Sequence, residues 1–207
     1  MRRIWGRPTS ANVMKVVWLL EELQLPYERV DAGGEYGRTD TPEYRALNPN
    51  RSVPVLQEDN YVLWESNAIL RYLCSAWAPD LPLWPRNPQA RGSIDRWMDW
   101  QQTVLNAPQA ALFWGLVRTP PAERDAAAIA AAAAKAGHAW TLLDEILGKA
   151  PYVAGPAFTL ADIALGVHVH RWFSFAIEGP ELAGLRAWYG RLLERPPYRR
   201  FVAGPVR

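Results

Sequence analysis

The chain has 207 residues, of which 49% are hydrophobic and 21% charged, and its formal net charge at pH 7 is +2. A chain of this length buries a sizeable core as one domain or as two small ones, and its nearly balanced charge gives no strong field for nucleic acid or anionic lipid. The only cysteine, Cys74, excludes an intrachain disulfide and a Cys-x-x-Cys redox or metal site.

The first third of the chain alternates strand and helix patterns. The expected elements are a strand at 3–6, a helix capped near 10 and running to about 24, a strand at 27–30, a flexible loop at 33–38, a hairpin with strands 53–57 and 61–64, and a helix after residue 65. We expect the last helix to bury a stripe of Ile69, Tyr72, Leu73 and Ala76. This order predicts an α/β fold with a thioredoxin-like mixed sheet.

Proline is concentrated in residues 78–88, which excludes a continuous helix there and predicts a semi-rigid linker. Strand patterns largely disappear after it. Helices are expected at 89–117, 122–147, 159–171 and 180–194, with a last turn at 197–203. We therefore predict a thioredoxin-like domain at 1–77, a linker at 78–88 and an all-α domain at 89–207.

The amino terminus, Met1 to Pro8, has no apolar core of the kind that secretory signals need. No apolar run is long enough to span a membrane. The expected location is therefore cytoplasmic, with no membrane and no nucleic-acid partner.

The most informative segment runs from Asn48 to Leu73 and contains Val53-Pro54 and Glu65-Ser66. A proline inside a short apolar run removes one ladder donor, so unpaired main-chain groups are expected beside it. Such groups can bind a peptide.

This segment resembles the glutathione-binding half of the cytosolic glutathione transferases, in particular their bacterial, theta- and beta-like members. In that family the corresponding Val-Pro bond is cis, and the valine backbone pairs with glutathione like an added strand. Two further segments extend the resemblance over nearly the whole chain: a Thr159-x-x-Asp162 helix cap and the Arg195-Pro196-Pro197-Tyr198 ending. The resemblance implies an N-terminal thioredoxin-like domain followed by an all-helical glutathione-transferase domain.

A glutathione transferase must make a thiolate available near neutral pH. Lowering the pKa of a free thiol from about 8.5 by about two units requires roughly 2.7 kcal/mol of preferential anion stabilisation. A hydroxyl hydrogen bond of about 1.5–3 kcal/mol and a helix N-terminus of about 0.3–1 kcal/mol suffice, so neither a metal nor a protein cysteine is needed.

The resemblance places Ser10 at the catalytic serine of theta- and zeta-like members and Asn12 at the cysteine of beta-like members; Thr9 is close enough to assist. Capping of the first helix is the alternative for Thr9 and Ser10.

The resemblance also implies the residues that hold glutathione, which is expected as the co-substrate. Ser66 is expected to bind the γ-glutamyl carboxylate and Glu65 the α-amino group, with helix capping as the alternative. The chain has Arg51-Ser52 where many relatives have a glycine followed by a basic residue. The glycyl carboxylate is therefore expected to meet Arg51 or else Arg38 in the flexible loop; both are more often solvated surface arginines.

The second domain is expected to line a pocket for a small apolar electrophile, with Phe113 and Trp114 as its walls. His168 and His170 are expected to be structural. The resemblance further implies a homodimer.

The leading interpretation is a glutathione transferase of the detoxification type, which conjugates the thiolate to apolar electrophiles. Two alternatives remain open: a glutathione-dependent isomerase or dehalogenase, and a non-catalytic glutathione-fold binding protein. A zeta-like isomerase is disfavoured because Ser10-Ala11-Asn12 does not match its Ser-Ser-Cys run. A thioredoxin-like oxidoreductase is disfavoured by the missing redox cysteine.

Overall fold

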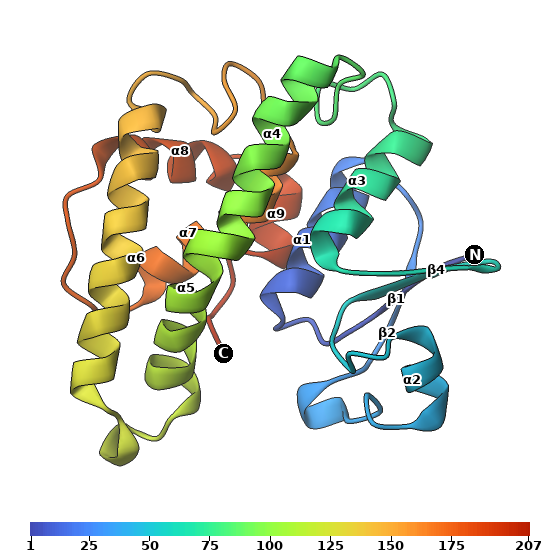
Figure 1. Cartoon of the computed structure of the whole chain (residues 1–207), viewed down its shortest axis with the longest axis horizontal. Helices are drawn as coiled ribbons and strands as arrows, with labels where there is room; N and C mark the ends of the chain where they lie inside the picture. Colours follow the sequence, from blue (N-terminus) through green and yellow to red (C-terminus); the bar gives the residue numbers. More distant parts are fainter.

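A four-stranded mixed sheet forms the centre of the first part of the computed structural model, which describes residues 1–207 (Figure 1). The strand order is β2-β1-β3-β4. β1 (Arg2–Trp5) pairs in parallel with β2 (Glu28–Val30), whereas β3 (Val55–Glu58) is antiparallel to both β1 and β4 (Tyr61–Trp64). The expected thioredoxin-like sheet is therefore confirmed.

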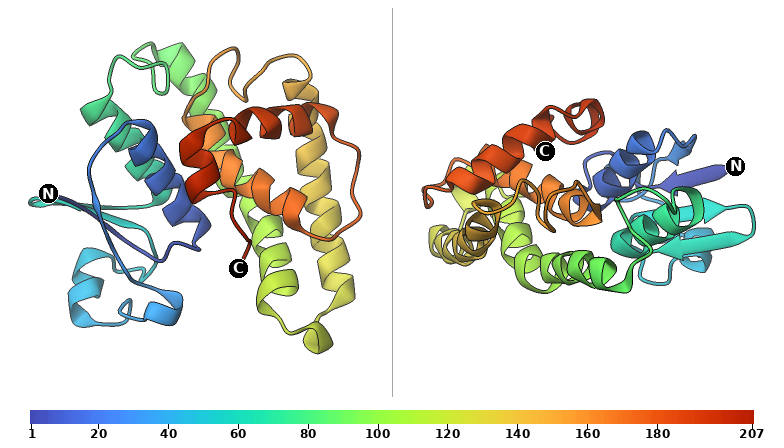
Figure 2. Two further views of the ribbon diagram at one scale, coloured as in Figure 1. Left: turned by 180° about the vertical axis from the view of Figure 1, so that it is seen from behind. Right: turned by 90° about the horizontal axis from the view of Figure 1, so that it is seen from above.

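Helices cover both faces of this sheet. α1 (Ala11–Glu22) and α3 (Ser66–Trp77) lie on the face that looks toward the helical part, and α2 (Pro42–Leu47) lies on the opposite face (Figures 1 and 2). The sequence patterns missed α2 and a single 3₁₀ turn at Gly34–Tyr36, which lies inside the segment expected to be a loop. One residue of the expected α3 stripe is also wrong, because Ala76 is exposed and Leu70 and Cys74 are buried instead.

The second part is entirely helical apart from one isolated β-bridge. Its helices are α4 (Pro88–Trp100), α5 (Asn106–Phe113), α6 (Ala126–Leu147), α7 (Leu160–Ser174), α8 (Ala183–Leu193) and α9 (Pro196–Phe201). The single helix expected at 89–117 is an unbroken run in which π-helical turns at Gln101–Leu105 and Trp114–Arg118 flank α5. Pro108 has no N–H to give to the carbonyl of Val104, which accounts for a local change of helix type in that turn. None of the helices combines the length and apolarity needed to cross a bilayer.

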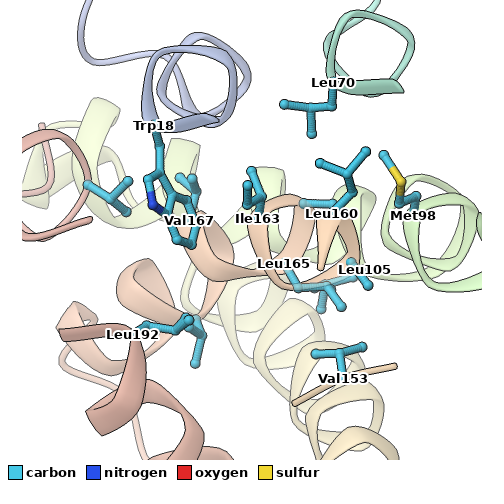
Figure 3. Packing of buried hydrophobic residues seen from close by; sticks show 14 of the residues in the cluster. Trp18, Leu70, Met98, Leu105, Val153, Leu160, Ile163, Leu165, Val167 and Leu192 are labelled. Carbon is cyan, nitrogen blue, oxygen red and sulfur yellow. The ribbon is translucent and has the colours of Figure 1, made fainter. Parts of the chain in front are cut away.

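α7 lies at the centre of the core and packs against α1 of the first part (Figure 3). Trp18 of α1 is fully buried, and a Cβ at Gly166 of α7 would come within 2.7 Å of its ring. Only glycine therefore permits this close approach. On the same side, Arg195 donates to both carboxylate oxygens of Glu22, at 2.8 and 2.7 Å. These contacts fix the C-terminal half of α1 against α7 and the start of α9.

The start of α7 carries the capping box expected from the sequence. The fully buried carboxylate of Asp162 accepts hydrogen bonds from the Thr159 N–H at 2.8 Å and from the Thr159 hydroxyl at 3.1 Å. It also accepts from the Val153 N–H at 3.0 Å and the Trp188 indole N–H at 2.9 Å. The cap thus holds a loop and α8 as well as α7.

Candidate functional site

The backbone of Val53 is unpaired just before β3. The Val53–Pro54 bond is cis, as the resemblance implied. The preceding carbonyl, that of Ser52, is held by the Tyr44 hydroxyl at 2.8 Å and by Asn48 Nδ2 at 2.9 Å. Neither the N–H nor the C=O of Val53 has a hydrogen-bond partner in the chain. Both groups are available to an extended peptide that adds to the sheet as a strand.

Ser10 lies in the turn between β1 and α1. It occupies the N-cap position with φ −77° and ψ 124°, but its hydroxyl accepts no bond from the helix and has no other partner. The residue is 9% exposed and lines a cavity. Helix capping is therefore excluded for this hydroxyl, which remains available to a ligand.

Asn12 and Ser66 connect the starts of α1 and α3. The Ser66 hydroxyl donates to Asn12 Oδ1 at 3.3 Å, and Ser66 itself is only 1% exposed. Two helix N-termini therefore meet at this point, and their first N–H groups have no partners within the helices. Such ends favour anions.

Glu65 precedes α3 in a rarely populated backbone conformation, with φ 71° and ψ 112°. Its side chain is exposed and makes no capping hydrogen bond. A non-glycine residue held in such a region costs about 1–3 kcal/mol and is typical of ligand-binding sites. The capping alternative for Glu65 is thus excluded.

The two arginines expected near the glycyl carboxylate are both exposed. Arg51 forms an ion pair with Asp40 at 3.0 Å. Arg38 has a positive φ of 68° in the loop. Neither lines the cavity beside Ser10, and their contact with glutathione stays a prediction.

A cavity of about 620 Å³ lies between the two parts of the chain, a volume typical of small-molecule sites. Ser10, Thr9 and Asn12 line it on one side, and Phe113 and Trp114 line it on the other. Phe113 is 7% exposed and Trp114 is 63% exposed. The aromatic residues singled out from the sequence therefore lie in the same cavity as the candidate catalytic hydroxyl.

Four arginines that the sequence analysis did not select also line this cavity: Arg7, Arg118, Arg171 and Arg207. None of them forms an ion pair. Burial, and then the charges of Arg7 and Arg118, lower the pKa of Arg171 to about 10. Burial and the charge of Arg118 likewise lower the pKa of Arg7, although Glu35 opposes this. The cavity thus carries an excess of positive charge.

A fully buried lysine lies behind the cavity wall. Lys15 donates to Gln101 Oε1 at 2.8 Å, and Gln101 Nε2 lies 3.1 Å from His168 Nε2. Because the oxygen of the amide faces the lysine, its nitrogen donates to His168, whose proton is then on Nδ1. Burial, and then the charge of Arg171, lower the pKa of Lys15 to about 7, and Glu65 opposes this shift. Burial, then the charges of Lys15 and Arg171, also lower the pKa of His168, which keeps this ring neutral.

His170 is engaged on both ring nitrogens. Nδ1 lies 2.8 Å from the Tyr189 hydroxyl and Nε2 lies 2.7 Å from the Gly204 carbonyl. No ring nitrogen of His170 is left for proton transfer to a ligand. No group of three or more His, Cys, Asp or Glu side chains is arranged to hold a metal ion.

Comparisons with known proteins agree with this geometry. Residues 2–75 match the family model for the glutathione S-transferase N-terminal domain, and residues 126–191 match that for the C-terminal domain. The chain is 40% identical to glutathione S-transferase GstB of Escherichia coli, over 100% of both chains, and 27% identical to glutathione S-transferase F10 of Arabidopsis thaliana, over 95% of this chain and 94% of that one. It also resembles the glutathione-bound crystal structure of the theta-class glutathione S-transferase from Xanthomonas axonopodis pv. citri, with 48% identity and a TM-score of 0.95 over 100% of this chain and 99% of that one. The chain belongs to the glutathione S-transferase family.

Proposed function

We propose that this protein transfers glutathione to a small electrophile, with residues 1–77 binding glutathione and residues 89–207 forming most of the pocket for the second substrate. The unpartnered Ser10 hydroxyl carries this proposal. It lies at the N-terminus of α1 and lines the cavity, and Gly6 at the start of the same turn lies beside Val53. A sulfur bound there meets a hydroxyl donor and a helix N-terminus together.

Glutathione fits this site by the chemistry of its parts. Its cysteinyl backbone pairs with the N–H and C=O of Val53, as an added strand. Its γ-glutamyl carboxylate lies at the N-terminus of α3 beside Ser66, and its α-amino group faces the exposed Glu65 carboxylate. The glycyl carboxylate extends toward the loop that carries Arg38 and Arg51. Thr9 and Asn12 position the turn that holds Ser10.

The reaction begins with ionisation of the thiol. A hydrogen bond from Ser10 to the thiolate contributes about 1.5–3 kcal/mol and the α1 terminus about 0.3–1 kcal/mol. Together they lower the pKa of the thiol by about 1–3 units, since one unit corresponds to about 1.36 kcal/mol. The sulfur then attacks the electrophile held in the cavity. Family membership and the predicted location suggest detoxification in the cytoplasm by a homodimer.

Ser10→Ala tests the assignment. We expect kcat/KM with glutathione and 1-chloro-2,4-dinitrobenzene to fall about 10- to 100-fold at pH 6.5, and the acidic limb of its pH profile to move up by about 1–2 units. Asn12→Ala is the matched control and should keep the position of that limb. Full turnover by Ser10→Ala together with an inactive Asn12→Ala would transfer the catalytic assignment to Asn12.

The binding-protein alternative predicts a different result. Retention on immobilised glutathione without turnover of any electrophile would support it. Isomerase or dehalogenase activity would keep the thiolate step and change only the second substrate.

A further inference from the structure

The arginine cluster, defined here as Arg7, Arg118 and Arg171, lines the same cavity as Ser10. Arg118 and Arg171 lie over the Phe113 ring, whereas Arg7 packs against the loop glycines Gly33 and Gly34. The cavity lining contains Ser10 and the cluster, but not Val53 or Glu65. Arg118 and Arg171 therefore lie at the Phe113 wall of the cavity, which is the space left for the second substrate, and Arg7 closes the cluster from the first part of the chain.

The charge of the cluster is only partly offset within the chain. Glu35 is the only acidic side chain in the lining, and it forms no ion pair with any arginine. The Nε of Arg7 is buried without a hydrogen-bond partner. Buried polar groups are nearly always satisfied, so an orphaned guanidinium nitrogen at a cavity indicates a missing acceptor.

Gln109 adds a second unsatisfied group to the same lining. It is 2% exposed, and neither its amide oxygen nor its amide nitrogen has a partner. An amide nitrogen and guanidinium groups are donors of the kind that bind a planar oxyanion.

The cluster is held in place by its surroundings. Arg171 donates to the Thr9 carbonyl at 3.0 Å, and its guanidinium lies 4.2 Å from the centre of the Phe113 ring. Arg118 lies 5.4 Å from the centre of the same ring. Two cations thus cover the aromatic wall that the sequence suggested for apolar electrophiles, while Trp114 leaves an apolar surface beside them.

We propose that the second substrate is a small electrophile that carries a carboxylate, which binds the arginine cluster while its carbon skeleton lies against the exposed Trp114 ring. This inference rests on the proposed function and replaces an uncharged substrate with an anionic one. For an aryl halide, the thiolate sulfur forms a C–S bond to the carbon that bears the halogen. The C–halogen bond then breaks, and halide leaves with the bonding electron pair. No oxidant or reductant is required.

The test compares 4-chloro-3-nitrobenzoate with 4-chloro-3-nitrobenzamide, which differ in charge at one substituent. Each kcat/KM is divided by the uncatalysed rate constant with glutathione, because the two compounds differ in intrinsic reactivity. We expect the normalised value to favour the benzoate by about tenfold or more. Arg118→Gln and Arg7→Gln should each remove about tenfold of this preference, through KM for the benzoate. The Arg118 side chain is exposed and contacts only the Phe113 ring, so its replacement should leave the fold intact.

Arg186→Gln is the matched control, because Arg186 is an exposed arginine of α8 outside the cavity lining. It should leave the preference unchanged. Calorimetric titration with the unreactive 3-nitrobenzoate and 3-nitrobenzamide adds a readout that needs no turnover. The benzoate should bind more tightly, and Arg118→Gln should abolish the difference.

The results that would refute the carboxylate site differ from those that would refute the proposed function. Equal normalised rates for the two probes, with 1-chloro-2,4-dinitrobenzene turned over normally, would refute the carboxylate site and leave the proposed function standing. An Arg118→Gln variant with a raised KM for glutathione and an unchanged probe preference would assign the cluster to a glutathione carboxylate and also refute it. Absence of glutathione turnover with every electrophile would refute the proposed function and this inference with it.

Discussion

Replacing Asp162 by alanine should destabilise the protein strongly, although the residue does not line the cavity. The substitution leaves three N–H donors without an acceptor, those of Val153, Thr159 and Trp188. An orphaned buried donor costs about 1–3 kcal/mol, so the three together cost about 6 kcal/mol. Burial raises the pKa of Asp162 to about 6, and the hydrogen bonds only partly oppose this shift. Removing the carboxylate therefore recovers about 3 kcal/mol at pH 7, and the expected net loss is about 3 kcal/mol.

The pH dependence gives the sharper test. Because the pKa of Asp162 rises from 3.8 to about 6 on folding, the native state binds more protons between those values, and stability from this group is lost as pH rises through about 6. The parent protein should therefore gain about 2 kcal/mol over Asp162→Ala between pH 7 and pH 4.5. Urea unfolding followed by tryptophan fluorescence, at one fixed protein concentration, measures both the loss of stability at pH 7 and its change between pH 7 and pH 4.5.

Asp144→Ala provides the control for this experiment. Asp144 accepts one backbone hydrogen bond, from the Leu185 N–H at 2.7 Å. Its replacement should cost about 1–3 kcal/mol. A difference between parent and Asp162→Ala that stays constant or shrinks as pH falls would refute the role given to the buried carboxylate.

Two further predictions concern the site. Lys15→Met should raise the free energy of unfolding relative to the parent at pH 7. Because burial lowers the pKa of Lys15 from 10.5 to about 7, the parent gains stability as the pH rises, and the advantage of Lys15→Met in urea unfolding should shrink by about 2 kcal/mol by pH 9. An advantage that grows with pH would contradict a buried ammonium at this position. Ser66→Ala should raise KM for glutathione about tenfold and leave the acidic limb of the pH profile in place, whereas a shifted limb in steady-state assays would show that Ser66 takes part in ionising the thiol.

The sheet and the long helices could be predicted because their signals are local. Val55 and Leu56 form a short apolar run that ends at a polar turn, which is typical of a buried strand, and the apolar positions of α1 recur every three and four residues. α2 was missed because it has only six residues, too few to show a period. The start of α2 could nevertheless have been predicted from the sequence. Thr41 caps the helix by accepting a hydrogen bond from the Tyr44 N–H, and Pro42 occupies the first turn.

The site could be predicted only in part, for a related reason. Ser10, Val53, Glu65 and Ser66 belong to short motifs whose spacing is visible in one sequence. The arginine cluster combines a loop residue with residues 118 and 171, and nothing local marks these as neighbours. Arg118 and Arg171 meet over Phe113 within the helical part, and Arg7 joins them because the first part docks through the contact of Trp18 with Gly166. The charge of the cavity is therefore a property of the packing between the two parts.

This packing gives the cluster a second electrostatic consequence. An anionic electrophile brings its carboxylate close to the thiolate, and two like charges raise the pKa of the thiol unless cations lie nearby. Arg171 contacts the Thr9 carbonyl, directly beside Ser10, so its positive charge acts on both anions. At an effective dielectric constant of about 20, unit charges about 4 Å apart interact by about 4 kcal/mol, comparable with the full stabilisation that Ser10 and the α1 terminus supply. The same arginines that select a carboxylate would therefore keep the sulfur ionised while that carboxylate is bound.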